Sequence, residues 1–395
     1  MTDTGSARSW GQERPGLDVY MVALTAALVG FGIVAVFSAT FARAALSAGD
    51  SLYKVKPQVA AAVAGALAMF VVARLNLERI RQLAYGAAAL AGLALVAVLV
   101  LGVEINGARR WFEIGPCHIQ PSEFAKLAVI VAAARFAMEN PRRIRSLKGL
   151  ALPMAVVAAG AALVLAEHDL GTAVVVTALA FLMWHFAGAK LRHLAVYAVV
   201  GLACVTVAIV AEPYRLARIK AWCDPGKTAL TSGYQQHHSV IALGAGGVLG
   251  RGLGEGREKY SYLPAAETDC IFAVIGEEMG LLGTWVLLAL FGLLLWRGLA
   301  ASLRVADPFC ALLGAGMTSL IALQVLINVA VVTGLMPAKG APLPFVSYGG
   351  SSLVSAMTAV GVLLNISRQP GRDLRPRGAA AGGASSSRAE RFPFA

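Results

Sequence analysis

Long apolar stretches recur along this chain, and they restrict the folds open to it more than any other feature. Each is about 20 residues long, enough for a helix to cross about 30 Å of hydrocarbon. The 395 residues are 58% hydrophobic and only 14% charged, with a mean hydropathy of +0.69. In lipid, backbone polar groups must be bonded within the protein, so such runs favour a bundle of helices. The sequence therefore predicts an all-α, polytopic membrane protein.

Ten transmembrane helices are predicted within a membrane domain that covers residues 18–368. The spans are 19–41, 57–75, 84–103, 122–138, 148–166, 170–188, 192–211, 270–296, 308–335 and 344–366. No signal-peptide cleavage site follows the first span, so residues 1–17 are expected to form a tail that precedes a retained helix. Residues 369–395 are rich in Arg, Gly, Ala and Ser and are expected to be a disordered tail.

The charges lie mostly in loops, and they alternate along the chain. The net charge is +12. Every second loop is rich in Arg and Lys, as at 142–148, whereas the loops between them carry few basic residues. The positive-inside rule then places both termini in the cytoplasm. The excess of positive charge therefore indicates how the protein is oriented in the cytoplasmic membrane, where it also contacts lipids. It does not indicate binding to nucleic acid.

Residues 212–269 form a predicted outer loop, between the seventh and eighth helices, that is far longer than a connector. It contains the glycine-rich segment GAGGVLGRGLGEG at 244–256, which matches no nucleotide-binding motif. One interpretation is a flexible loop. The other is a mobile element that covers a substrate and moves on glycine hinges.

The cysteine and histidine residues do not indicate a metal centre. The five cysteines include no CxxC pair and no Cys/His cluster, so neither a zinc site nor a disulfide framework is supported. His237 and His238 are adjacent, but they lack further ligands for an ion.

Ionisable side chains at membrane depth are functional candidates because they are costly there. Asp269 precedes the eighth span, where it is either a helix cap or a reactive carboxylate. Helix geometry puts Glu277 about 80° around from Asp269 and roughly 12 Å deeper. Glu278 points to the opposite side and is the more structural of the two.

Further polar candidates lie near the outer ends of other spans. Glu123 and Lys126 are three residues apart, either as an ion pair or as part of a site. Arg109 and Arg110 either anchor the chain at the interface or clamp phosphate through bidentate bonds. Asp169, in a tight outer turn, is either a cap or a site residue.

The stretch 328–354 breaks the helical pattern with three prolines and a glycine, which predicts a re-entrant or tightly turned loop. The small residues that follow it, including Ser347, Gly349, Gly350 and Ser351, either permit close helix packing or leave polar groups free to line a cavity.

This stretch resembles the signature of the FtsW/RodA/SpoVE family. The matching residues are Asn328, Gly334-Leu335, Pro337, Lys339-Gly340 and the run PLPFVSYGGSS from 342 to 352. The resemblance extends through NGARRW (106–111), QPSE-x-AK (120–126), DLGT (169–172), PYRLAR (213–218), SGYQ (232–235) and ETD-x-IFAVIGEE (267–278). It covers about residues 18 to 368. GAKLRHL (188–194) and VTGLMPAKG (332–340) look most like the family's division member.

The resemblance implies a peptidoglycan glycosyltransferase that polymerises lipid II outside the cytoplasmic membrane at the division septum. It also implies a class B penicillin-binding protein as partner, together with other divisome proteins. Asp269 matches the family's essential aspartate. By the same matching, the implied substrate-binding residues are Arg110, Glu123, Lys126, Asp169, Arg215, Gln235, Lys339, Ser347 and Ser351. Glu277, Pro337, Gly349 and Gly350 are expected to shape the cavity. Ala266, Glu267 and Cys270 depart from the family's pattern, and they flank the aspartate without replacing it.

The mechanism expected from these residues is an inverting transfer. Asp269 would act as general base on a sugar hydroxyl, and Arg110 and Lys126 would stabilise the leaving undecaprenyl diphosphate. The one cofactor left open is a divalent cation, Mg²⁺ or Mn²⁺. The alternatives are a lipid II flippase or transporter, a role in elongation like that of RodA, and a scaffold without activity. No inverted repeat is visible, which favours an enzyme over a transporter.

Overall fold

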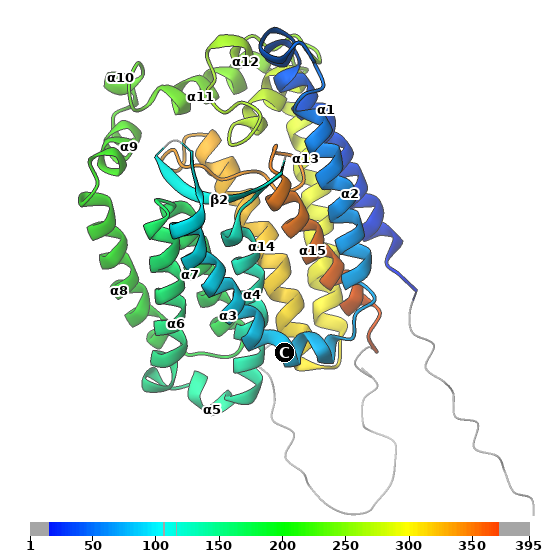
Figure 1. Cartoon of the computed structure of the whole chain (residues 1–395), viewed down its shortest axis with the longest axis vertical. Coiled ribbons are helices and arrows are strands. Elements are labelled where there is room, and N and C mark those ends of the chain that lie inside the picture. The colour runs from blue at the N-terminus through cyan, green and yellow to red at the C-terminus, as the bar shows by residue number, and fades with distance from the viewer. Residues whose placement is uncertain (1–15, 106, 116, 371–395) are drawn as a thin grey trace, which may run out of the picture.

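A computed structural model describes residues 16–105, 107–115 and 117–370, and most of these residues are helical (Figure 1). The predicted tails, apart from a few residues, lie outside the described residues. The helices are α1 (Val19–Ala48), α2 (Val55–Val72), α3 (Leu77–Leu101), α4 (Pro121–Glu139), α5 (Pro141–Ile144), α6 (Leu147–Ala166), α7 (Leu170–Phe186), α8 (Leu191–Val210), α9 (Pro213–Cys223), α10 (Pro225–Thr228), α11 (Tyr234–Gly246), α12 (Glu258–Ser261), α13 (Ile271–Arg304), α14 (Pro308–Val332) and α15 (Gly350–Ser367).

Eight of these helices are long and apolar enough to cross a membrane, which confirms a multi-pass membrane protein. They are α1, α2, α3, α6, α8, α13, α14 and α15. The two other predicted spans coincide with α7, which is apolar but shorter, and with α4, which carries the charged residues Glu123, Lys126 and Arg135. The count of ten spans stays a prediction.

The two ends of the bundle differ in what they carry. Helices α9 to α12 lie together over one end, which we call the loop end (Figure 1). Helix α5 lies at the opposite end, and the two ends of the described chain lie near each other there, since Gly16 and Gln369 line one cavity. We call this the termini end. The chain therefore enters and leaves the bundle on one side, and the charge pattern predicts that this side is cytoplasmic.

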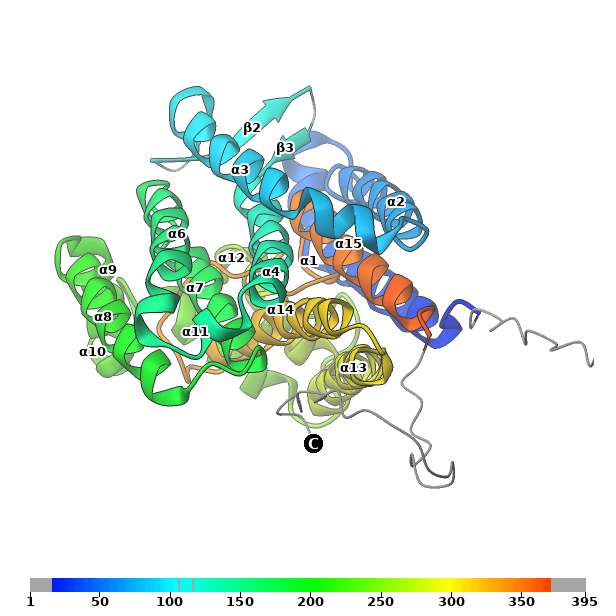
Figure 2. The ribbon, with the colours of Figure 1, turned by 90° about the horizontal axis from the view of Figure 1, so that it is seen from below.

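Helix α14 forms the centre of the bundle. Seen from below, it lies among α4, α7, α13 and α15, and it packs against all four (Figure 2). Most of its residues are buried, including Gly314 and Gly316, whose lack of a side chain lets neighbouring helices approach closely. Helix α8 is peripheral, with Leu194 as its one buried residue. An apolar helix so exposed is expected to face lipid.

A small antiparallel sheet of three strands is the one part of the fold that the all-α prediction lacked. Its strands are β1 (Val103–Ile105), β2 (Ala108–Ile114) and β3 (Cys117–Ile119), in the order β1-β2-β3. The predicted span 84–103 accordingly ends earlier, with α3 at Leu101. Successive strand residues face opposite sides. Arg109 therefore pairs with Glu104 at 3.6 Å, whereas Arg110 reaches the turn after α6.

Helix α13 is broken near its loop end. Gly280 has φ 64° and ψ −163°, so the helical hydrogen-bond ladder stops there. The glycine-rich segment 244–256 supplies the missing partners. The N–H groups of Leu281 and Leu282 donate to Gly247 and Val248 at 2.9 and 3.1 Å, and the carbonyls of Glu277 and Glu278 accept from Arg251 and Gly252 at 3.0 and 2.9 Å.

Gly250 shows why this segment is rich in glycine. A Cβ at this position would lie 2.1 Å from the carbonyl oxygen of Glu278, and its φ is +82°, where a side chain is strained. The segment is therefore a docked part of the fold that completes α13. This corrects the interpretation of 244–256 as a flexible loop.

Glu277 and Glu278 are stable as buried carboxylates because each has its own hydrogen-bond or ion-pair partners. Glu277 accepts the backbone N–H of Arg257 at 2.8 Å, at the start of α12. Glu278 pairs with Lys259 at 2.6 Å and accepts from the Ser38 hydroxyl at 2.7 Å. Both carboxylates lie before the break at Gly280, on the short part of α13 that the predicted outer loop covers. They are structural groups, as the sequence predicted for Glu278.

The connection between α14 and α15 is an irregular loop over residues 333–349, which agrees with the turned loop predicted there. The predicted span from 344 starts too early, because α15 begins at Gly350. The residues before it bond to another segment: the N–H of Tyr348 donates to Glu267 at 2.8 Å, and the hydroxyl of Ser347 donates to Thr268 at 2.6 Å.

Candidate active site

Asp269 lies at the loop end, one residue before the N-cap of α13 and against the loop 333–349. The side-chain amide of Asn328, on α14, donates to the backbone oxygens of Asp269 and Ala341 at 2.9 and 2.7 Å. It thereby ties the two segments together. The N–H of Ala341 bonds to the Asp269 carboxylate. A Cβ on Gly340 would lie 3.1 Å from that carboxylate, so glycine permits the close approach.

The surroundings of Asp269 favour its neutral form more than water would. Burial raises its pKa to about 6, and the negative charge of Asp169 adds to the rise. The positive charges of Arg218 and Arg110, and the N–H of Ala341, act in the opposite direction. A carboxylate with a pKa near the working pH is suited to proton transfer in both directions.

Two arginines of the PYRLAR motif have different roles in the structure. Arg215 donates to the carbonyl of Ala208 at 2.9 Å, at the end of α8. Arg218, one turn further along α9, donates to the carbonyl of Ala338 at 2.9 Å and acts on Asp269 through its charge. The sequence motif predicts a role for Arg215 and does not distinguish Arg218. Positions three apart share a helix face, but only the packing of α9 on the loop 333–349 identifies the residue that faces Asp269.

Asp169 and Arg110 meet at the turn between α6 and α7. Asp169 is the N-cap of α7 and accepts from the N–H and hydroxyl of Thr172 at 2.9 and 2.8 Å. Arg110 donates from Nε to the carbonyl of Glu167 at 2.9 Å and from Nη2 to the carbonyl of His168 at 2.6 Å. Asp169 is therefore a cap, and its charge also reaches the site, since it raises the pKa of Asp269.

Glu167 is a buried acid that the sequence pattern does not indicate. Its side chain is fully buried, and neither carboxyl oxygen has a hydrogen-bond partner among the described residues. Burial raises its pKa to about 8, with Asp169 adding to the rise and Arg110 opposing it. The surroundings of Glu167 therefore favour its neutral form, which limits the negative charge at the turn.

A small cavity with both polar and apolar lining residues lies beside Asp269. It is lined by Glu123 and Lys126 of α4, by Gly171 and Thr172 of α7, and by Lys339 and Gly340 of the loop 333–349. Its volume is about 20 Å³, enough for about one water molecule. Lys126 pairs with Glu123 at 2.8 Å in a bridge that is almost fully buried.

Lys339 faces the same cavity. Its Nζ donates to the carbonyl of Gly171 at 3.2 Å. Burial lowers its pKa to about 8, with the charge of Lys126 adding to the effect and Asp169 opposing it. The structure thus brings together Glu123, Lys126, Asp169 and Lys339, from three segments that are far apart in sequence.

Three other predicted site residues make hydrogen bonds that hold segments in place. Ser347 joins the loop 333–349 to Thr268, next to Asp269. Ser351 accepts from the N–H of Gln120 at 3.0 Å and donates to the carbonyl of His118 at 3.1 Å. Gln235 donates from its amide to the sulfur of Cys270 at 3.2 Å.

The remaining predicted positions shape the loop 333–349. Pro337 is half-buried in it. The N–H of Gly349 donates to the side-chain oxygen of Gln58 at 3.2 Å. Gly350 starts α15, where a Cβ would lie 3.6 Å from the Cβ of Ala61, an ordinary contact.

Within the described residues, no group of three or more His, Cys, Asp or Glu side chains is placed to hold a metal ion. His238 instead bonds through Nδ1 to Glu258 at 2.7 Å, and its ring packs against those of Tyr234 and Tyr262.

These features define a class: a multi-pass membrane protein with a carboxylate and several cations gathered at one end of its bundle. The chain matches the family model FtsW/RodA/SpoVE, described as "Cell cycle protein", over residues 19–371. It therefore belongs to the FtsW/RodA/SpoVE family.

Similar proteins cover nearly the same length. Stage V sporulation protein E of Bacillus subtilis is 38% identical, over 89% of this chain and 97% of its own. The probable peptidoglycan glycosyltransferase FtsW of Geobacter metallireducens is 38% identical, over 89% of this chain and 94% of its own.

Solved structures show the same fold. A chain from work on "structural coordination of polymerization and crosslinking by a peptidoglycan synthase complex" aligns with a TM-score of 0.75 at 32% identity, over 89% of this chain and 98% of that one. The rod shape determining protein RodA of Thermus thermophilus aligns with a TM-score of 0.67 at 31% identity, over 89% and 97% of the two chains.

Proposed function

We propose that this protein is a peptidoglycan glycosyltransferase that polymerises lipid II into glycan strands during cell division, with Asp269 as general base. The observation that carries the proposal is the setting of Asp269. It is an acid at the predicted outer end of the bundle, with a pKa of about 6 and with arginines whose charges act on it. Relatives that the chain matches over most of its length bear the name of this activity.

The chemistry follows from the acceptor. A sugar hydroxyl is a weak nucleophile at neutral pH, and a carboxylate that takes its proton as the new bond forms accelerates attack by about 10² to 10⁴. Attack from the face opposite an α-linked diphosphate inverts the anomeric carbon and gives a β link. The proton passes to Asp269, and the bond electrons leave with undecaprenyl diphosphate.

The leaving diphosphate needs positive charge. Arg110 and Lys126 are the groups we propose for this role, and Arg218 and Lys339 add two further cations. Lys126 is already paired with Glu123. A lipid-linked disaccharide does not fit the cavity of about 20 Å³ as it stands. Substrate binding is therefore expected to rearrange the loop end.

A divalent cation, Mg²⁺ or Mn²⁺, is part of the proposal as a companion of the diphosphate. Mg²⁺ is usually bound by one or two carboxylates together with substrate phosphates. The carboxylates nearest the proposed diphosphate are those of Asp269, Asp169 and Glu123, and the last two already accept from Thr172 and Lys126. A bound ion would neutralise charge on the diphosphate.

The proposed setting is the septum, in the cytoplasmic membrane, with a class B penicillin-binding protein as transpeptidase partner and with other divisome proteins. One similar structure comes from work on a peptidoglycan synthase complex that couples polymerization and crosslinking. The charge bias of the loops supports cytoplasmic termini and an outer loop end.

The test is polymerisation of purified lipid II by detergent-solubilised protein, with and without its transpeptidase. Glycan polymer on a gel is the expected product. Detergent removes the membrane that a transporter would need, so polymer formation supports an enzyme over a flippase. No polymer under any of these conditions, with folded protein, would contradict the proposed function.

The rate should depend on pH with an acid limb near pH 6. Asp269 must be ionised to accept a proton, and its pKa is about 6. Below that pH the ionised fraction, and with it kcat/KM, should fall about tenfold per pH unit. Initial rates between pH 4.5 and 8 measure this limb. A profile that stays flat down to pH 4.5 would contradict a base with this pKa.

Replacing Arg218 by Gln should move that acid limb to higher pH. Arg218 is the largest single charge that lowers the pKa of Asp269, so its loss raises the pKa. Arg215→Gln is the matched control, because Arg215 bonds to Ala208 instead and should leave the limb in place. A limb that moves equally in both variants would show that Arg218 has no specific action on Asp269.

A further inference from the structure

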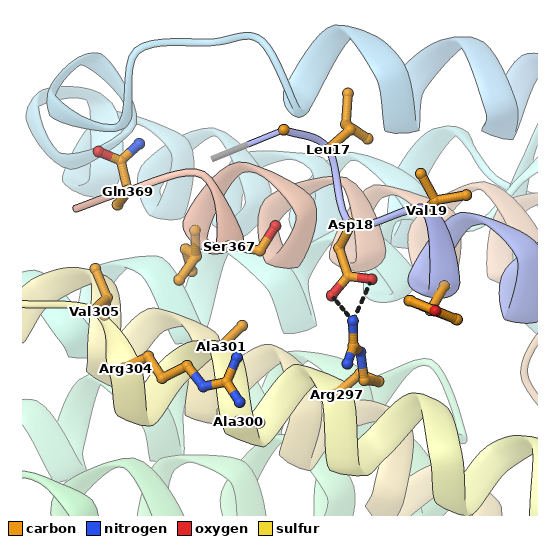
Figure 3. A pocket seen from close by; sticks show the side chains of 13 residues that line it. Leu17, Asp18, Val19, Arg297, Ala300, Ala301, Arg304, Val305, Ser367 and Gln369 are labelled. Atoms are coloured by element: carbon orange, nitrogen blue, oxygen red, sulfur yellow. Dashed lines mark hydrogen bonds and ion pairs between the residues drawn. The ribbon is translucent and has the colours of Figure 1, made fainter. Parts of the chain in front are cut away.

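A second cavity lies at the termini end, far from Asp269. It has a volume of about 340 Å³, within the range of small-molecule sites. Three segments enclose it: residues 16–20 at the start of α1, residues 297–305 at the end of α13, and residues 366–369 at the end of α15 (Figure 3). None of the residues predicted to act in catalysis lines it.

Exposed aromatic rings beside the cavity indicate that it lies near the depth of the bilayer headgroups. Tyr20, which lines it, is 70% exposed, and Trp296, next to the lining residue Arg297, is 62% exposed. Exposed Tyr and Trp rings gather at the membrane–water interface. Leu299 and Leu303 of α13 are also exposed. The rim of the cavity therefore borders an apolar surface suited to acyl chains.

The charge in the cavity is positive. Arg297 and Arg304 are seven residues apart on α13 and so project from one face of the helix. The Nη2 of Arg297 lies 2.9 Å from both carboxylate oxygens of Asp18 (Figure 3). The guanidinium of Arg297 lies over the ring of Tyr20. Arg304 is exposed, and within the described residues it has no ion-pair or hydrogen-bond partner.

The polar groups that line the cavity at the end of α15 already have hydrogen-bond partners. The Ser367 hydroxyl donates to the carbonyl of Leu364 at 2.8 Å, and the Gln369 amide donates to Asn365. The cavity therefore offers a ligand one unpaired guanidinium, a second one shared with Asp18, and apolar walls from residues such as Val305 and Ile366. This set suits an anion that carries a hydrocarbon part.

We propose that this cavity binds the headgroup of an anionic phospholipid, with the phosphate on Arg304 and the acyl chains along the exposed apolar face of α13. Arginine recognises phosphate through charge-assisted, bidentate hydrogen bonds. Basic pockets between transmembrane helices on the cytoplasmic side are suited to such headgroups. Free phosphate shares the headgroup's chemistry, but it would leave the apolar walls and rim unused.

The experiment is lipid binding to the full-length, detergent-purified protein, followed by native mass spectrometry. The probes are dioleoylphosphatidylglycerol, which is anionic, and dioleoylphosphatidylcholine, which has the same chains and no net charge. We expect the first molecule of phosphatidylglycerol to bind about five- to tenfold more tightly than the first molecule of phosphatidylcholine. Each arginine near the membrane surface raises the affinity for an anionic lipid by about this factor. Inorganic phosphate should not compete at the same concentration.

Two variants should change the affinity for phosphatidylglycerol in opposite directions. Arg304→Gln should weaken it about five- to tenfold, since the unpaired charge is lost. Asp18→Asn should strengthen it, because Arg297 is released, and Asn still accepts the N–H of Met21 as a helix cap. Arg145→Gln is the control: it removes one exposed positive charge at the same end, away from the cavity, and should change little.

Each contrary result would overturn the proposal. Equal binding of the two lipids would show that the cavity does not select charge. Equal losses in Arg304→Gln and Arg145→Gln would show a diffuse effect of surface charge. Competition by inorganic phosphate at matched concentration would show that phosphate itself, and not a lipid, is the ligand. This experiment does not measure polymerisation of lipid II, so its result does not depend on whether the proposed function is correct.

Discussion

Replacing Asp269 by Asn is expected to lower the rate of lipid II polymerisation by about 10² to 10⁴. Asparagine has nearly the same shape but cannot accept the proton of the attacking hydroxyl. The side-chain amide of Asn328 donates to the backbone oxygen of residue 269, so the substitution does not remove this hydrogen bond. The measurement is the initial rate of polymer formation by purified protein at pH 7.5.

The matched control is Glu267→Gln, two residues earlier. Glu267 pairs with Lys54 in a bridge that is partly exposed, so its loss should leave the rate close to that of the unchanged protein. Co-purification of the transpeptidase partner with Asp269→Asn should persist, which separates an enzyme from a scaffold. An Asn variant that polymerises lipid II at the unchanged rate would remove Asp269 from the role of base.

Replacing Lys259 by Met is expected to lower the free energy of unfolding by about 3–5 kcal/mol, because it leaves Glu278 buried without its counter-ion. Lys259 is 2% exposed, and its Nζ bonds to Glu278 at 2.6 Å and to the carbonyl of Gly254 at 2.8 Å. The measurement is thermal and denaturant unfolding in detergent micelles.

The double variant Lys259→Met with Glu278→Leu tests the cause. Replacing a whole buried pair by apolar groups is often neutral, so the second change should recover much of the lost stability. Lys56→Met is the control, since its pair with Asp50 is exposed and should contribute little. If the double variant is no more stable than Lys259→Met, packing rather than the unpaired charge is responsible.

The membrane helices could be predicted from the sequence because each is a local property. A run of about 20 apolar residues crosses lipid as a helix whatever surrounds it. The acid at 269 could also be found locally, since a charged residue beside an apolar run stands out. The turned loop at 333–349 follows from its prolines, which remove donors and restrict the chain.

What the sequence could not predict depends on contacts between distant segments. The break at Gly280 exists because residues 244–256 replace the missing helical bonds, and no pattern within α13 shows this. Arg218 and Arg215 look alike in the motif, and only the packing of α9 separates them. The cavity beside Asp269 needs α4, α7 and the loop 333–349 together.

The break in α13 also bears on how the protein enters the membrane. Residues 281–304 alone are about 36 Å long as a helix and carry no acid, so they suffice to cross the bilayer. The two glutamates before the break never have to be transferred into hydrocarbon during biosynthesis. In the proposed orientation, residues 244–256 cross to the far side first, because they precede α13 in the chain. They are then in place to receive the start of the helix as it leaves the translocation machinery.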